Sequence, residues 1–196
     1  MTLYEALPEN LEYLGKEYRL YASFDRVLEA LAFIKRQDFS DAEKTEYLTF
    51  LFFGDGVAPD AELVSAALAL LCPASENSGV RSFDWEQDAA AIYASFLSVY
   101  GIDLYSVRGK LHWTAFIALL QNLPRDSAFG RLIDIRTCEV PQVTKYNQKQ
   151  VQNLMKAKAA YRLRISEEER QAQWQAGLQN IATQMMSNAK AGEQRG

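Results

Sequence analysis

Between residues 83 and 124 the apolar side chains recur at every third or fourth position, which is the spacing of one buried face of an α-helix. Asp84 is a suitable N-cap for this helix, with Gln87 as its capping-box partner. Gly101 ends the helix, because a residue without Cβ enters the left-handed conformation at little cost. After a loop over residues 102–104, a second apolar helix begins around Trp113. The stretch therefore predicts a helical hairpin. The predicted buried stripe of its first helix consists of Trp85, Ala89, Ile92, Phe96, Val99 and Tyr100.

Three segments of this region and of the residues after it are long and mixed in composition: FDWEQDAAAIYASFLSVYGIDL, LHWTAFIALLQNLP and FGRLIDIRT. They resemble the siphophage family often called gene product fifteen, and the similarity extends over roughly residues 7–165. The resemblance implies a tail-assembly chaperone that acts during virion construction and is absent from the mature virion. The partners that it implies are the tape-measure protein and the tail tube protein.

The rest of the chain predicts a mainly α fold: a helical domain with a short N-terminal β-hairpin and an amphipathic C-terminal helical arm. We expect the hairpin and several helices in residues 1–72, a linker in residues 73–82, the signature helical region in residues 83–165 and the arm in residues 166–196. The linker is rich in Ser, Gly and Asn, which are typical of loops. One domain with a mobile connection and two small subdomains both fit this pattern.

Local signals predict where the individual elements begin. Gly15 and Lys16 are the expected central residues of the hairpin turn. The next helix is expected over residues 24–36. Further helix starts are predicted at the capping residues Ser40 (with Glu43), Asp60 and Asp126. Residues 145–165 predict a longer helix whose apolar face carries Val151, Leu154, Met155, Tyr161 and Ile165.

The charges are unevenly distributed along the chain. Residues 1–140 contain 12 Lys and Arg against 21 Asp and Glu, a net charge of −9, whereas residues 141–196 contain 9 against 4, a net charge of +5. The basic part is either a solvated helix face or a docking arm for an acidic partner or nucleic acid. The sequence pI of about 5.2 argues against nucleic acid as the main ligand. Lys145, Lys149 and Lys156 cluster nearly opposite the apolar face and are candidate partner-binding residues.

A capping box of Ser166 and Glu169 predicts a last helix with a narrow apolar stripe. Such a helix either lies on the body or occupies a partner's groove. The stripe supplies the remaining candidate partner-binding residues, Trp174, Leu178, Ile181 and Met185. The signature helix also has a side of small residues, which is either a packing surface, within the fold or in a homo-oligomer, or an exposed helix side. That side consists of Ala90, Ala91, Ala94, Ser95 and Ser98.

The residues give no support to a catalytic or metal site. The single histidine, His112, lies at the start of an apolar helix, where a packed or capping role is expected. Asp84, Glu86 and Asp88 are expected to complement the dipole of their helix rather than to bind magnesium. No phosphate-binding or nucleophile motif occurs. We therefore expect a non-catalytic protein without a cofactor or metal.

Two isolated cysteines, Cys72 and Cys138, are expected as buried free thiols of a reducing compartment. No apolar run approaches the roughly 18–20 residues needed to cross a bilayer. The host cytoplasm, which the resemblance implies, fits these features. A structural tail component, such as a tube cap or connector, and a nucleic-acid-binding regulator are the alternative functions.

Overall fold

The computed structural model describes residues 4–73 and 82–164. Met1–Tyr161 form one compact unit and Arg162–Gly196 a second, of which residues 162–164 are described. The described residues are mainly helical, which confirms the predicted fold class. The elements in chain order are β1 (Asn10–Tyr13), β2 (Lys16–Arg19), α1 (Phe24–Ile34), α2 (Asp41–Phe53), α3 (Ala61–Leu71), α4 (Ala89–Ser95), the π-helix η1 (Phe96–Tyr100), α5 (Trp113–Gln121), α6 (Ala128–Thr137) and α7 (Gln148–Ala160).

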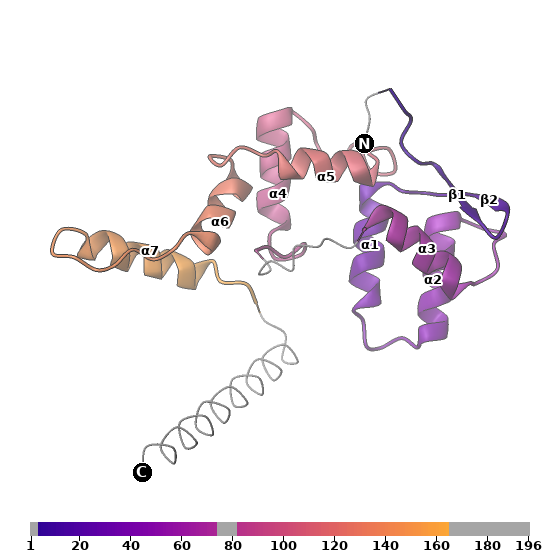
Figure 1. Cartoon of the computed structure of the whole chain (residues 1–196), viewed down its shortest axis with the longest axis horizontal. Helices are drawn as coiled ribbons and strands as arrows, with labels where there is room; N and C mark the ends of the chain where they lie inside the picture. The colour runs from indigo at the N-terminus through magenta and orange to yellow at the C-terminus, as the bar shows by residue number, and fades with distance from the viewer. Residues whose placement is uncertain (1–3, 74–81, 165–196) are drawn as a thin grey trace, which may run out of the picture. The chain divides into compact units, whose positions relative to one another are not determined.

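The predicted N-terminal hairpin is present, with a turn one residue earlier than expected. Strands β1 and β2 pair antiparallel, with Tyr13 opposite Lys16. The central turn residues are therefore Leu14 and Gly15, and both have positive φ, of 50° and 71°. Positive φ at both positions is the mark of a type I′ turn, in which the second position favours glycine. Figure 1 shows the hairpin beside α3, where Tyr13 donates a hydrogen bond to Glu62.

The capping residues of α2 and α3 are confirmed. Ser40 accepts a hydrogen bond from the backbone N–H of Glu43, and the Glu43 carboxylate accepts one from the backbone N–H of Ser40. Asp60 accepts from the backbone N–H groups of Glu62 and Leu63. For α6 the prediction is wrong by one residue, because Ser127, rather than Asp126, accepts from the N–H of residue 130.

The signature helix starts later than predicted and changes its winding. Asp84 caps the N–H groups of Glu86 and Gln87, but these residues form turns, and regular α-helix begins at Ala89. From Phe96 the chain is a π-helix that ends at Gly101, whose φ of 67° confirms the predicted left-handed cap. The wider turn rotates later positions away from the predicted stripe. Val99 is accordingly 38% exposed, and Ala89 is exposed as well.

The core is built around the aromatic ring of Phe116 on α5. This side chain is 1% exposed and stacks against Phe24, Phe96 and Trp113, with ring centroids 4.9, 5.1 and 5.7 Å away. Phe24 belongs to α1 and Phe96 to η1, so the N-terminal helices and the signature region share one core.

Backbone hydrogen bonds join the same two regions. Residues Ser23 and His112 form an isolated antiparallel bridge, in which the N–H of Phe24 donates to the carbonyl of Leu111. The indole N–H of Trp113 donates to the carbonyl of Leu71, at 2.9 Å. The start of α5 is thereby fixed on α1 and on the end of α3.

The side of small residues on the signature helix is divided. Ser95 is fully buried, and its hydroxyl accepts a hydrogen bond from the backbone N–H of Phe129 on α6. Ala91 is half-buried, whereas Ala90, Ala94 and Ser98 are exposed. The buried part is therefore a packing surface for α6 within the fold. In α6, Gly130 fits closely: a Cβ atom there would lie 2.3 Å from the carbonyl oxygen of Pro124.

Candidate partner-binding surface

The three candidate lysines lie on α7 and in the turn before it. Lys145 precedes the helix, and Lys149 and Lys156 lie on it, two turns apart on the same side; all three are exposed. The helix runs from Gln148 to Ala160, shorter than the predicted range of residues 145–165. The four remaining candidates, Trp174, Leu178, Ile181 and Met185, lie outside the described residues, as do the expected capping box at Ser166 and most of the expected linker.

Apolar side chains are also exposed on and near α7. Val151 is buried, at 3% exposure, and Leu154 is half-buried, as expected of the apolar face. Met155 and Tyr161 were expected on the same face, but they are 57% and 47% exposed, since Val151 is the buried residue of α7 and the helix ends before Tyr161. Val143 and Tyr146 in the preceding turn are more exposed still. The exposed basic and apolar side chains on and next to α7 are together called the α7 surface: Val143, Lys145, Tyr146, Lys149, Met155, Lys156 and Tyr161.

The end of α7 is attached to α6 by two polar contacts with one residue. The Lys158 ammonium donates to the carbonyl oxygen of Arg136, at 2.9 Å. The Arg136 Nε–H donates to the carbonyl oxygen of Tyr161, at 2.6 Å. Arg136 lies in the last turn of α6, so these bonds tie the C-terminal ends of the two helices together.

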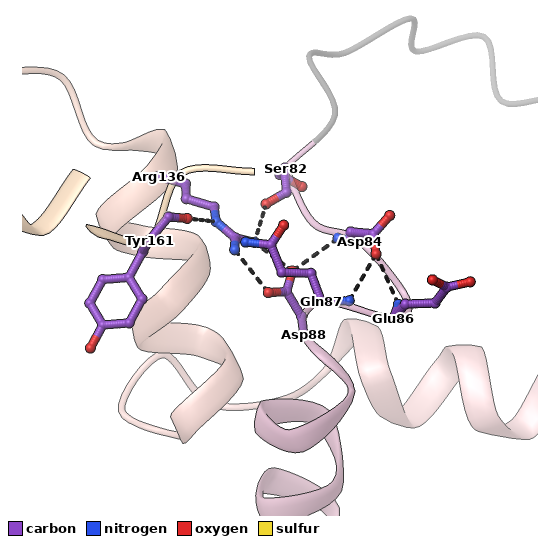
Figure 2. Close-up of polar contacts among 7 residues, drawn as sticks. All are labelled: Ser82, Asp84, Glu86, Gln87, Asp88, Arg136 and Tyr161. Atoms are coloured by element: carbon purple, nitrogen blue, oxygen red, sulfur yellow. Dashed lines mark hydrogen bonds and ion pairs between the residues drawn. The ribbon is translucent and has the colours of Figure 1, made fainter. Parts of the chain in front are cut away.

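The same guanidinium forms a buried ion pair with Asp88 at the start of α4. Its two terminal nitrogens bind the two carboxylate oxygens at 2.5 and 2.8 Å, and the side chains are only 8% and 1% exposed. A third bond runs from Arg136 to the carbonyl oxygen of Ser82. Figure 2 shows Arg136 between Asp88, Ser82 and Tyr161. We call this arrangement the Arg136 clamp; it joins α4, α6, the end of α7 and the chain entering the signature region.

Asp88 has a different role from the one predicted. Besides binding Arg136, its carboxylate accepts a hydrogen bond from the backbone N–H of Asp84, which replaces the expected partner Gln87. The Asp84 carboxylate is directed to backbone N–H groups of the following turn. The three acidic side chains at 84, 86 and 88 therefore do not share a common ligand position. Among the residues that the structure describes, no group of His, Cys, Asp and Glu side chains is arranged to hold a metal ion.

His112 is an N-cap, in agreement with the sequence interpretation. Its Nδ1 accepts a hydrogen bond from the backbone N–H of Thr114, at 3.1 Å. Its Nε2 lies 3.1 Å from the carbonyl oxygen of Pro8, so the network assigns the proton to Nε2. Both ring nitrogens are thus engaged with the backbone.

The two cysteines differ in environment. Cys72 is half-buried, and burial raises the pKa of its thiol above the ordinary value. Cys138, at the end of α6, is exposed, so the expectation of a buried thiol is wrong for this residue. Cys138 is the C-cap of α6, where the chain leaves the helical conformation, so the side chain is not on the buried face of the helix.

Two apolar cavities open elsewhere on the described structure. One, of about 450 Å³, lies between α5 and α6, with Leu123 and Ile133 in its lining. The other, of about 270 Å³, is bounded by α1, α4 and the loop before α5. The sequence interpretation did not find either cavity, since each is assembled from segments far apart in the chain.

No helix in the described part of the chain is sufficiently long and apolar to span a bilayer. No curated protein and no solved structure matches the chain significantly. A family model described as Bacteriophage Gp15 protein matches residues 65–163, which are 99 of the 196 residues. The matched region includes most of α3 and all of α4 to α7, and with them the Arg136 clamp and the three candidate lysines. The chain therefore belongs to the bacteriophage Gp15 protein family.

Proposed function

We propose that the protein is a phage tail-assembly chaperone, which binds the tape-measure protein and helps the tail tube to assemble around it. The observation that carries the proposal is membership of the Gp15 family. In this proposal the protein acts in the host cytoplasm of a siphophage infection, has no catalytic activity and is left out of the mature virion.

The α7 surface supports the proposal physically. A very long helical protein with exposed apolar stripes aggregates unless those stripes are covered. Exposed Met155 and Tyr161 offer apolar contact, and Lys149 and Lys156 offer positive charge on another side of the helix. An amphipathic helix with acidic residues at its edges suits such a surface. The stripe of Trp174, Leu178, Ile181 and Met185 is the second proposed contact element.

Co-expression with the tape-measure protein of the same phage tests the proposal. We expect the tape-measure protein to become soluble and to co-purify with this chain by affinity pull-down. A folded chain that elutes alone, while the tape-measure protein remains insoluble, would contradict the chaperone function. Truncation after Ile165 should weaken co-purification without unfolding the body; full retention would remove the C-terminal stripe from the proposal.

A charge-reversal variant with a matched control tests the part played by the α7 surface. Lys149→Glu/Lys156→Glu reverses two charges on the surface, whereas Lys16→Glu/Lys110→Glu reverses two exposed charges elsewhere. We expect the first double variant, but not the second, to lose most of the co-purified tape-measure protein. Equal losses would show that overall charge, and not this surface, governs the interaction.

Two alternative functions predict different observations. A structural tail component, such as a tube cap or connector, would be found by mass spectrometry in purified virions, where a chaperone is absent. A nucleic-acid-binding regulator would shift DNA or RNA in a gel, with an affinity that falls steeply as salt rises. The net charge of −9 over residues 1–140 makes the second alternative the weaker one.

A further inference from the structure

A cavity and a smaller pocket adjoin along one side of α1. The cavity of about 270 Å³ is bounded by α1, α4 and the loop before α5. The pocket of about 110 Å³ lies between α1 and residues 84–86. Leu28 and Trp85 line both spaces, so the two adjoin, and we call them together the α1–α4 groove.

Five of the eleven residues that line the cavity are aromatic. Phe24 and Phe116 form its buried floor, and Tyr105, 72% exposed, forms its rim in contact with Tyr93. An apolar cavity of about 150 Å³ is enough to hold benzene. The larger volume here therefore has room for one aromatic side chain entering from outside.

The distance between the cavity and the pocket matches the distance between side chains on one face of a helix. From α1 the cavity is lined by Phe24, Asp25 and Leu28, and the pocket by Leu28, Leu31, Ala32 and Lys35. At a rise of about 1.5 Å per residue, the two sets are centred roughly 5–10 Å apart along α1. Residues at i and i+4 or i+7 of a second helix lying along α1 have a similar separation.

The wall opposite α1 is acidic. Asp84 and Glu86 border the pocket, and Asp103 hydrogen-bonds Tyr93 beside the cavity. On the α1 side, Arg108 lies 3.9 Å from Asp25, so those two charges compensate each other, and Lys35 adds one positive charge at the end of the pocket. A helix seated in the groove would therefore meet negative charge along one flank, which favours Lys and Arg there.

We propose that the α1–α4 groove binds an amphipathic helix of a partner protein. An aromatic side chain of that helix fills the cavity, a smaller apolar side chain fills the pocket, and basic residues face Asp84, Glu86 and Asp103. The groove is separate from the α7 surface, and the inference does not depend on the identity of the tape-measure protein as a partner.

Fluorescence polarisation with the full chain and synthetic peptides tests the proposal. The first probe is a fluorescein-labelled helical peptide with Trp at i, Leu at i+4 and Lys along one flank. The control probes replace Trp by Ala or the lysines by Glu. We expect loss of the anchoring Trp to weaken binding at least about tenfold, as for a buried interface anchor. We expect the acidic probe to bind more weakly than the basic one.

Two variants locate the binding. Ala89→Trp places a ring into the cavity, whereas Ala90→Trp adds the same ring at an exposed neighbour that does not line it. We expect Ala89→Trp to weaken the basic probe at least about tenfold and Ala90→Trp to leave it unchanged. Glu86→Lys, at an exposed position, should narrow or invert the preference for the basic probe.

The proposal is overturned if the first probe does not bind the wild-type chain. It is also overturned if that probe binds the Ala89→Trp and Ala90→Trp variants equally well. A peptide of residues 168–188 of this chain is included because it also carries Trp174 and Leu178 at i and i+4. Binding of that peptide in place of the basic probe would make the occupant a segment of this chain's own sequence, and would overturn the assignment to a different partner protein.

Discussion

Phe116 on α5 lies among four other aromatic rings, whereas α7 contributes a single buried side chain, Val151, to the described structure. The core is stabilised by the burial of apolar surface and by close packing, which are not directional and involve many neighbouring residues. The end of α7 is held by directional bonds that converge on Arg136. Loss of one ring therefore weakens the whole body, whereas loss of one guanidinium releases a particular element.

This contrast fits a protein that presents α7 to a partner. An element attached by few apolar contacts opens at a lower free energy than the core does. The exposed lysines and apolar residues of the α7 surface can then change position without disturbing the packing around Phe116. The five predictions below test this contrast, in order of decreasing effect.

Phe116→Ala should have the largest effect on stability. Removal of a large buried aromatic side chain costs about 3–5 kcal/mol, because apolar burial is lost and a cavity is left. Urea unfolding followed by circular dichroism measures the change. Phe50→Ala is the matched control, since Phe50 is 50% exposed, and it should cost well under half as much. Similar costs would mean that the ring cluster is not the centre of the core.

Arg136→Met should cost roughly 3 kcal/mol, because it leaves the buried Asp88 carboxylate without its partner. The control Arg131→Met removes an exposed arginine from the same helix and should change little. Hydrogen exchange distinguishes the two regions: amides of α7 should lose protection at conditions where those of α5 keep it. Equal loss in both helices would contradict the local role of the clamp.

A double variant separates the charge from the packing of the clamp. In Asp88→Leu/Arg136→Met both charges are absent, so no buried charge remains unpaired, and much of the stability should return. The bond from Arg136 to Tyr161 is still missing in this variant. We therefore expect global stability to recover more than the protection of α7 does.

Gly130→Ala should destabilise the protein by about 1–3 kcal/mol, as overpacking does. Glycine to alanine within a helix ordinarily gains up to about 1 kcal/mol, so the expected sign is reversed. The reason is the backbone of residues 124 and 125, whose atoms would lie 2.3–2.9 Å from the new Cβ. A higher urea midpoint would show that this turn moves aside easily.

The elements that the sequence predicted well depend on nearby residues. The capping boxes and N-caps at Ser40 and Asp60 act within three residues, so their signals lie in a few letters of sequence. The hairpin was found for the same reason, although its turn was placed one residue late. The π-helix from Phe96 was not predicted, because the apolar spacing of the segment fits an α-helix equally well.

The features that were missed depend on distant residues. Asp88 and Arg136 are 48 positions apart, and neither has a local pattern that distinguishes it from a surface charge. The α1–α4 groove takes its lining from residues between 24 and 116, which only the folded chain brings together. For the candidate site, helical periodicity correctly placed the lysines on an exposed face of the helix. The same periodicity wrongly assigned Met155 and Tyr161 to the buried face.

Lys149→Gln/Lys156→Gln should have the smallest effect on stability, within about 0.5 kcal/mol of the wild type. Both side chains are exposed, and no ion pair joins them to another residue in ranges 4–73 and 82–164. Urea unfolding and tape-measure co-purification should be measured on the same preparation. Weaker co-purification at unchanged stability would separate the function of the α7 surface from the integrity of the fold. A drop in stability comparable with that of Arg136→Met would instead make these lysines part of the attachment of α7, and the contrast between core and α7 would no longer rest on the Arg136 clamp alone.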